Sequence, residues 1–163
     1  MSKHEYVTAR REDVRPIPEK IVPFVRRMTK LFTKLNVAVY KASGGRLMNQ
    51  FQGQPICLVT MIGAKSGQVR EVPLMHVPVD DRKILVASQG GLEMNPAWYY
   101  NLKANPEVDI LAAGAKRKYR ARQVDENEKA ELWPTIVAAY ADYDEYQART
   151  DRDIPVFVCD PID

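Results

Sequence analysis

The feature that most constrains this chain is a series of short apolar, β-branched runs separated by tight turns. The runs cover residues 55–61, 69–79, 83–88, 108–112, 116–124 and 154–159. Strands that follow one another through hairpins favour an antiparallel sheet over alternating βαβ units. Six short strands with helices between them predict an α+β fold, a small, mostly antiparallel barrel with flanking helices.

Prolines and capping residues mark where these elements break. Pro73 and Pro78 fall inside the run 69–79, and proline cannot donate to a ladder, so this strand should be an edge, bulged or broken. Asn95 followed by Pro96 predicts the start of a short helix that runs to residue 103. Asp125 with a glutamate three residues later resembles a capping box, and a further helix is expected over residues 142–149.

The N-terminal part of the chain differs in character. Residues 1–16 are polar and aperiodic and predict a flexible arm, whereas residues 17–163 are expected to form a single domain. Apolar residues recur at helical spacing between residues 17 and 42, and Arg26, Arg27, Lys30 and Lys34 fall largely on the other side. This basic amphipathic helix either docks on the domain with a solvated basic face or makes a peripheral contact with an anionic membrane.

Several function classes are excluded by composition. No apolar stretch is long enough to span a membrane and the N-terminus has no apolar leader, which predicts a cytoplasmic protein. The cysteines, Cys57 and Cys159, lie about a hundred residues apart, and His4 and His76 are the two histidines. Cysteines and histidines so few and so far apart in the sequence predict neither a metal site nor a redox motif, and the thiols are expected to be reduced.

Charge is distributed unevenly along the chain. Residues 1–122 hold 21 Lys and Arg against 10 Asp and Glu, whereas residues 123–163 hold 3 against 11. A basic region of this size suits an anionic ligand, an anionic lipid surface or nucleic acid, unless the two regions simply neutralise each other. No nucleic-acid-binding motif is present, so no nucleic-acid partner is expected.

Two glycine-containing segments suit ligand binding. Residues 63–70 combine two glycines with Lys65, Ser66 and Arg70, which predicts either a simple turn or an anion site; a strand follows, so this is not a P-loop. Residues 87–91 end a strand in Ser88 and Gln89 before two glycines, which permits a flat ligand to approach the backbone.

Two aromatic clusters complete the candidate sites. The adjacent Trp98, Tyr99 and Tyr100 cannot all face one core from a short helix, so at least one should cover a pocket or face solvent. Tyr140, Tyr143 and Tyr146 recur every third residue, which places their phenols near one face.

Taken together, four motifs are specific. GxKSGQxRxxPL, a strand ending Ala-Ser-xx-Gly, NPxWYxNLKANPxV and YxxYxxYQxxTDRxIPVFVC follow one another in this order. Over residues 40–161 the chain resembles the deazaflavin-dependent nitroreductase family. The resemblance implies a split β-barrel fold and the cofactor coenzyme F-420, an 8-hydroxy-5-deazaflavin.

The resemblance also implies roles for individual residues. Those matching the segment that holds the phosphate and acidic tail are Ala64, Lys65, Ser66 and Arg70. Those lining the next part of the groove are Glu71, Val72, Pro73, Leu74 and Met75. Those beside the deazaflavin ring are Val86, Ala87, Ser88 and Gln89, with a second cofactor segment at Ala97, Trp98, Tyr99, Tyr100 and Asn101. The catalytic candidates are Ser88 and the substrate-side Tyr140, Tyr143 and Tyr146, of which Tyr143 is also expected to contact the cofactor.

The implied reaction is hydride transfer from the reduced coenzyme to an electron-poor acceptor such as an enone, quinone or nitro compound. The proton or hydrogen bond that the product needs would come from Ser88, a tyrosine or water. Three positions depart from the family's usual residues: Ala64 replaces Arg, Met75 an aromatic residue and Gln89 Lys. These departures bear on nitroimidazole-type activity more than on cofactor binding.

Two other functions stay open from the sequence. The first is a flavin mononucleotide oxidoreductase on the same barrel, and the second is a non-catalytic module that binds anions or lipid. A monomer and a homodimer are both compatible with the sequence, and the expected partner is a small electrophilic substrate.

Overall fold

The computed structural model describes residues 4–15 and 18–162 of the chain, and of the helix side chains it leaves out Ile21 and residues 25–32. Most of the apolar and basic side chains of the predicted amphipathic helix therefore lie outside the described residues. Four α-helices are described: α1 (Val22–Ala42), α2 (Ala97–Ala104), α3 (Glu126–Ala139) and α4 (Asp142–Arg149). Short 3-10 turns lie at Arg11–Asp13, Glu19–Ile21 and Gln89–Gly91.

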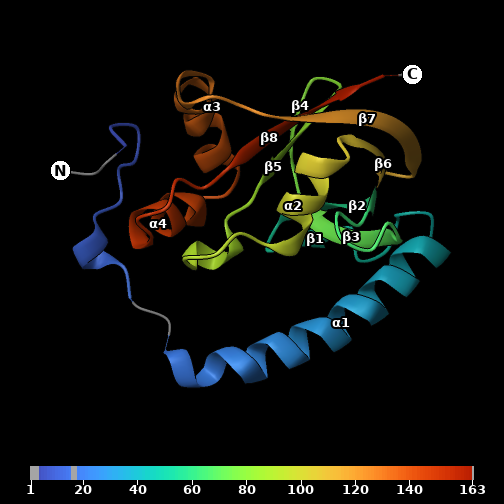
Figure 1. Cartoon of the computed structure of the whole chain (residues 1–163), viewed down its shortest axis with the longest axis horizontal. Coiled ribbons are helices and arrows are strands. Elements are labelled where there is room, and N and C mark those ends of the chain that lie inside the picture. Colours follow the sequence, from blue (N-terminus) through green and yellow to red (C-terminus); the bar gives the residue numbers. More distant parts are fainter. Residues whose placement is uncertain (1–3, 16–17, 163) are drawn as a thin grey trace.

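The strands form one antiparallel sheet. They are β1 (Gln50–Phe51), β2 (Gln54–Ile62), β3 (Val69–Met75), β4 (Val77–Val79), β5 (Arg82–Val86), β6 (Glu107–Ala112), β7 (Ala115–Gln123) and β8 (Val156–Pro161). Their order is β1-β2-β6-β7-β8-β5-β4, and β3 pairs with β2. Since β3 and β4 are consecutive, they bring the two ends of this order together and curl the sheet (Figure 1). The predicted antiparallel α+β fold is confirmed.

Eight strands replace the six that the sequence predicts. The two-residue β1 carries too few residues to give a pattern, and the run 69–79 is divided in two at His76. The backbone N–H of His76 donates to Pro55 O (3.1 Å), the residue opposite it in the register of β2 and β3, but Pro55 has no N–H to donate in return. Both pieces are edge strands, as Pro73 and Pro78 predict, because β3 pairs with β2 and β4 pairs with β5.

Side chains on alternate positions divide the core between two faces of the sheet. Cys57, Leu85 and Phe157 belong to a buried cluster on one face, whereas Ile84 and Val158 belong to a second cluster that also contains residues of α3 and α4. Burying each of the larger side chains stabilises the fold by about 1.5–3 kcal/mol. The strand period of two therefore places α3 and α4 on one face of the sheet, whereas Trp98 and Leu102 of α2 pack on the other.

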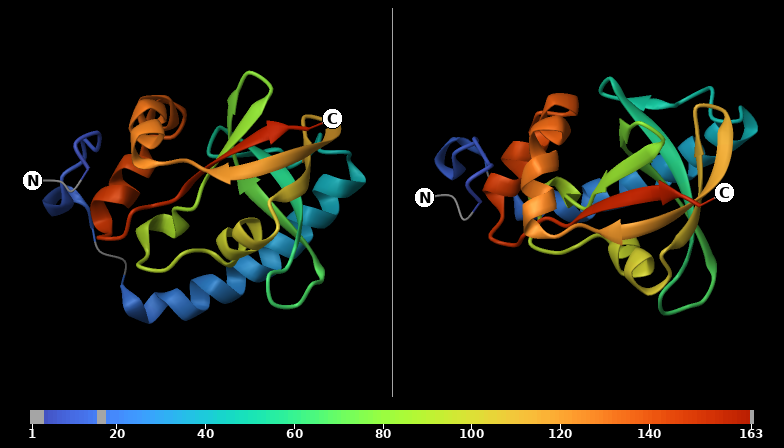
Figure 2. Two further views of the ribbon diagram at one scale, coloured as in Figure 1. Left: turned by 45° about the horizontal axis from the view of Figure 1, so that its top comes forward. Right: turned by 90° about the horizontal axis from the view of Figure 1, so that it is seen from above.

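The helices surround the curled sheet unequally. In two views, α3, α4 and the N-terminal segment lie together at one end, while α1 runs along the side of the molecule (Figure 2). The last turns of α1 pack on β2 through the buried Tyr40, which contacts Ile56 and Leu58. Helix α2 begins after an N-cap at Pro96, so Asn95 is not the cap as predicted; its side chain is instead engaged by Arg152.

Candidate active site

An elongated groove follows the turn between β2 and β3 and the face of α2. We call it the outer groove; its volume is about 1110 Å³. It is lined by Gly63, Ala64, Lys65, Ser66, Arg70, Glu71, Val72, Gln89, Met94, Asn95, Ala97, Trp98, Tyr100, Asn101, Lys103 and Ala104. Two segments of the chain that are each short and local thus provide nearly all of this surface.

The turn that forms one wall contains two glycines, of which Gly67 needs the conformational freedom of glycine. Gly67 has a positive φ of 65° and its N–H donates to Gly63 O (2.9 Å), while a Cβ on Gly63 would lie 2.6 Å from Ser66 Oγ. The N–H of Ala64 donates to Asn101 Oδ1 (2.9 Å), which tethers the turn to α2. This amide, which the resemblance assigns to the cofactor tail, is therefore already paired within the protein.

Cations dominate the outer groove. Lys65, Arg70 and Lys103 line it, and the Arg70 guanidinium lies 3.5 Å from Ser66 Oγ. The one acidic residue among the lining residues, Glu71, is paired with Lys41 of α1 (2.8 Å). Because that carboxylate is neutralised, the groove suits a ligand with several negative charges.

A second cavity continues from the groove, and Gln89 and Trp98 line both. We call it the inner cavity; its volume is about 600 Å³. Its walls are Thr33, Asn36, Met48, Gln50, Phe51, Ile56, Pro73, Leu74, Met75, Val86, Ser88, Gln89, Pro96, Trp98 and Tyr143. Most of these side chains are apolar, and the polar ones are Thr33, Asn36, Gln50, Ser88 and Gln89. Such a lining suits a flat ring system that makes a few oriented hydrogen bonds.

The three tyrosines come together, as their spacing predicts. The rings of Tyr140 and Tyr143 lie 5.1 Å apart, and the Tyr140 and Tyr146 hydroxyls lie 3.3 Å apart. Of the three, Tyr143 is found among the lining residues of the inner cavity. Burial raises the pKa of Tyr143, so its phenol stays protonated at neutral pH.

Tyr140 makes a different contact. Its hydroxyl lies 2.6 Å from Gln52 Oε1 and 2.8 Å from Asp142 Oδ2, and one phenolic hydrogen can serve only one of them. Gln52 and the following Gly53 both have positive φ values, 49° and 78°, at the tip of the β1–β2 hairpin. Tyr140 therefore fastens this hairpin, whose Phe51 lines the inner cavity, to the end of α3.

Some predicted site residues lie elsewhere. Ala87 is fully buried in the core, and Tyr99 packs against Phe157 with ring centroids 5.8 Å apart; neither is among the residues that line the two cavities. Tyr99 and Tyr100 thus divide as expected for adjacent aromatics, since Tyr100 is half exposed in the groove.

Sequence reasoning missed contributors to both cavities. Those of the inner cavity include Thr33 and Asn36 of α1 and the β1 residues Gln50 and Phe51, which no local pattern connects with the site. Lys103 of the outer groove had a signal, because it lies three residues after Tyr100 on the same short helix.

Residues 4–9, predicted to belong to a loose arm, make specific contacts with α4. The carboxylate of Asp144 accepts from Thr8 N (2.9 Å), Thr8 Oγ1 (2.6 Å), Ala9 N (2.7 Å) and the Trp133 indole (2.8 Å). Burial alone would raise the pKa of Asp144, but these hydrogen bonds together lower it. The N-terminal segment is thereby fixed to the helix that carries Tyr143.

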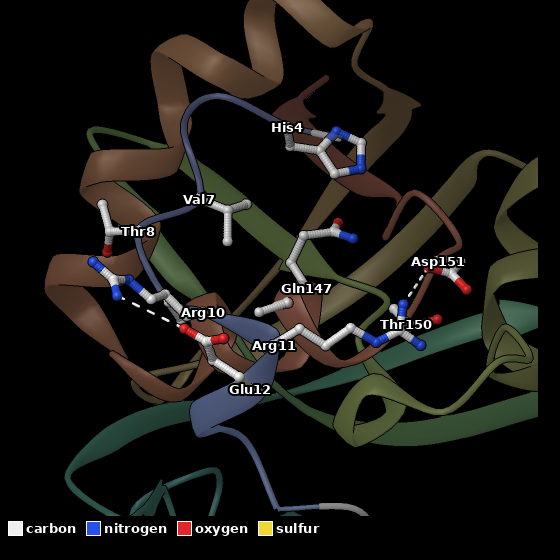
Figure 3. A pocket seen from close by; sticks show the side chains of 11 residues that line it. His4, Val7, Thr8, Arg10, Arg11, Glu12, Gln147, Thr150 and Asp151 are labelled. Atoms are coloured by element: carbon white, nitrogen blue, oxygen red, sulfur yellow. Dashed lines mark hydrogen bonds and ion pairs between the residues drawn. The ribbon is translucent and has the colours of Figure 1, made fainter. Parts of the chain in front are cut away.

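A third cavity of about 620 Å³ lies between this segment and the end of α4 (Figure 3). Its two arginines already have carboxylate partners: Arg10 lies 3.7 Å from Glu12, and Arg11 pairs with Asp151. These charges are balanced within the protein, unlike those of the outer groove.

Among residues 4–15 and 18–162, no group of three or more His, Cys, Asp or Glu residues could hold a metal ion. Cys57 and Cys159 are buried free thiols. In the same residues, no helix has both the length and the apolar character needed to cross a membrane.

Comparison with known proteins agrees with this geometry. Residues 32–161 match the profile of a family described as F420H(2)-dependent quinone reductase. An F420H(2)-dependent quinone reductase of Mycobacterium tuberculosis is 36% identical over 129 residues, which cover 77% of this chain and 87% of the relative.

Solved structures give the same result. An F420-H2 dependent reductase is 44% identical, with a TM-score of 0.61 over 65% of this chain and 94% of the other. A structure described as a domain-swapped dimer is 37% identical, with a TM-score of 0.63 over 85% of this chain and 98% of the other. The deazaflavin-dependent split barrel that the motifs predict is confirmed, and the chain belongs to the F420H(2)-dependent quinone reductase family.

Proposed function

We propose that the inner cavity holds the deazaflavin ring of coenzyme F-420 and that the outer groove holds its anionic tail. The family's reaction is hydride transfer from the reduced coenzyme to electron-poor acceptors. The observation that carries the assignment is the junction of an apolar cavity with a cationic groove at Gln89 and Trp98. The flat ring of the coenzyme fits the apolar inner cavity, and its polyanionic tail fits the cationic outer groove.

The residues of the chain would act mainly by position and charge. Lys65 and Arg70 would neutralise the tail, and Trp98 with Pro73 would enclose the ring. When bound, the reduced deazaflavin supplies the hydride. The place of these residues in the lining of the two cavities supports their assignment to these roles.

Ser88 is the best-placed polar group of the inner cavity for the acceptor. Its side chain is buried at the end of β5, where a hydroxyl can donate a hydrogen bond to an oxygen that gains negative charge. Tyr143, which lines the inner cavity, would pack against the acceptor and not supply its proton, because burial raises the pKa of its phenol and makes it a weaker acid. Water is then the expected source of the proton.

We propose a quinone or an enone as the acceptor. The name of the Mycobacterium tuberculosis relative, a quinone reductase, supports this class. The mostly apolar walls formed by Phe51, Met75 and Tyr143 favour a planar, uncharged molecule over a charged one.

Helix α1 has an exposed surface that could contact a larger partner. Phe24 and Leu35 of α1 are 69% and 61% exposed, which supports contact of this helix with an anionic membrane surface from the cytoplasmic side. Cosedimentation with anionic and with neutral vesicles tests it. The solved structure described as a domain-swapped dimer supports a homodimer, which light scattering tests.

A paired titration tests the cofactor assignment. Binding of oxidised coenzyme F-420 and of flavin mononucleotide is followed by fluorescence under the same conditions, and the deazaflavin is expected to bind more tightly. Oxidation of the reduced coenzyme by a quinone then checks the acceptor. Equal or tighter binding of flavin mononucleotide would reject the assignment.

A further inference from the structure

Arg152, which follows α4, uses its guanidinium to hold a distant segment of the chain. Nε donates to Leu92 O (2.7 Å), Nη1 donates to Asn95 Oδ1 (2.8 Å), and Nη2 donates to Ala87 O (3.0 Å) and Ser88 O (2.7 Å). All four acceptors are carbonyl oxygens of residues 87–95. Only the planar fork of arginine presents donors in this arrangement, since a lysine offers a single point charge.

The segment 87–95 belongs to both parts of the active site. Ser88 lines the inner cavity, Gln89 lines both parts, and Met94 and Asn95 line the outer groove. Arg152 itself is not among the residues lining either part. Any effect of Arg152 on a ligand must therefore act through the segment that it holds.

The backbone of this segment needs external support. Gln89, Gly90 and Gly91 have consecutive positive φ values of 45°, 64° and 77°. A non-glycine residue in this region is strained and stays there when its surroundings fix it. Gln89 is the non-glycine residue among the three, so its strained conformation depends on contacts from outside the turn, whereas Gly90 and Gly91 adopt positive φ values without strain.

Helix α4 supplies a second part of that support. Arg149 donates to Gly90 O (2.6 Å), and a Cβ placed on Gly91 would lie 2.7 Å from Tyr146 O. The segment is thus in direct contact with the helix that carries Tyr143 and Tyr146. This contact joins the segment that carries Ser88 to the helix that carries Tyr143, and both residues line the inner cavity.

We propose that Arg152 is a positioning residue for the deazaflavin ring. It fixes residues 87–95 against α4, so that Ser88 and Gln89 face the ring at a constant distance from Tyr143. This inference rests on the proposed function, because it takes the inner cavity as the ring site. It assigns a role to the Arg of the TDRxIPVFVC motif, which cofactor contacts alone leave without one.

The variants are Arg152→Lys, which keeps the charge, and Arg152→Gln, which keeps part of the hydrogen bonding. Arg122→Lys is the matched control, because Arg122 also makes several side-chain hydrogen bonds, to Glu128 and Asp160, but lies outside both cavities. Thermal unfolding shows which variants are folded at the temperature of the experiment.

The first readout needs no ligand. Hydrogen–deuterium exchange of the free protein should rise in residues 87–95 of both Arg152 variants and stay unchanged there in Arg122→Lys. Unchanged exchange in a folded Arg152 variant would overturn the proposal, since the segment would then hold its conformation without the guanidinium.

The second readout is the affinity for two ligands, oxidised coenzyme F-420 and the deazaflavin chromophore without phosphate and acidic tail. Arg152→Lys should weaken both by the same factor, about tenfold or more, because the ring contacts are misplaced. A loss confined to the full coenzyme, or full affinity in Arg152→Lys, would mean that Arg152 acts through its charge, which overturns the proposal. If the wild-type protein binds neither ligand, both the proposed function and the role of Arg152 are wrong. If it binds both ligands and the Arg152 variants bind them with the same affinity, only the role of Arg152 is wrong.

Discussion

The outer groove and the inner cavity are built in different ways. The groove comes from a glycine turn and one short helix, and its Lys65 and Arg70 are exposed with few fixed contacts. The inner cavity draws its walls from α1, β1, β2, β3, β5, α2 and α4, and buried polar networks connect α4 with neighbouring elements. One such network joins Lys129 of α3 to Gln147 of α4 (2.9 Å).

This difference separates two kinds of recognition. Attraction of an anionic tail tolerates mobile side chains, because Coulomb energy changes slowly with distance. Orientation of a ring for hydride transfer does not, because a misplacement of about 1 Å can cost a factor of about 100 in rate. Substitutions in the outer groove should therefore change the affinity for the coenzyme but not the free energy of unfolding. Substitutions behind the inner cavity should change both quantities.

The largest effect is expected for Asp144→Ala. It leaves the Thr8 and Ala9 amides and the buried Trp133 indole without their acceptor, which should lower the free energy of unfolding by roughly 3–5 kcal/mol. Urea unfolding measures it. Asp151→Ala is the control, because Asp151 also contacts the N-terminal segment. It removes only an exposed ion pair with Arg11, so it should lower the free energy of unfolding by less than about 1 kcal/mol. Equal losses of unfolding free energy in the two variants would show that the buried hydrogen bonds of Asp144 stabilise the fold no more than the exposed ion pair does.

Acid should weaken the fold through His76, which is buried between β3 and β4 beside Met75 of the inner cavity. Burial and the nearby Lys83 lower its pKa from about 6.5 to about 4. The unfolded chain binds more protons in this window, so stability falls as the pH drops from about 6.5 to 4, by up to about 3 kcal/mol. Urea unfolding at several pH values should show a smaller slope for His76→Gln. Parallel curves for the two proteins would contradict this assignment.

Removal of the groove cations should act on affinity alone. Lys65→Ala and Arg70→Ala are each expected to weaken binding of oxidised coenzyme F-420 by on the order of 1–3 kcal/mol, with little effect on the chromophore without its tail. Fluorescence titration measures both, and Arg46→Ala, an exposed cation outside the groove, is the control. If both groove variants keep the wild-type affinity, the groove does not hold the tail.

The smallest effect is expected for Tyr143→Phe. If the buried phenol packs against the acceptor and does not donate a proton, turnover of a quinone should stay within about threefold of wild type, whereas Tyr143→Ala should raise KM strongly. A loss of about 100-fold in Tyr143→Phe would identify this hydroxyl as the proton donor instead. Steady-state rates, with cofactor affinity measured separately, decide between the two.

The same division explains what the sequence can predict. The hairpins, the edge strand with Pro73 and the turn that carries Lys65 depend on neighbouring residues, so local patterns predict them. Asn36 and Phe51 reach the inner cavity only through tertiary packing, and no local pattern marks them. The docking of Thr8 on Asp144 joins residues 136 positions apart, which is why the segment 4–9 gives the pattern of a loose arm.

The central claim is that one elongated ligand spans both parts of the site. A crystal structure of the protein with oxidised coenzyme F-420 tests it directly. The ring is expected in the inner cavity against Trp98, beside Ser88, with the acidic tail between Lys65 and Arg70 of the outer groove. A ring bound outside the inner cavity, or a tail that leaves the groove empty, would contradict the account.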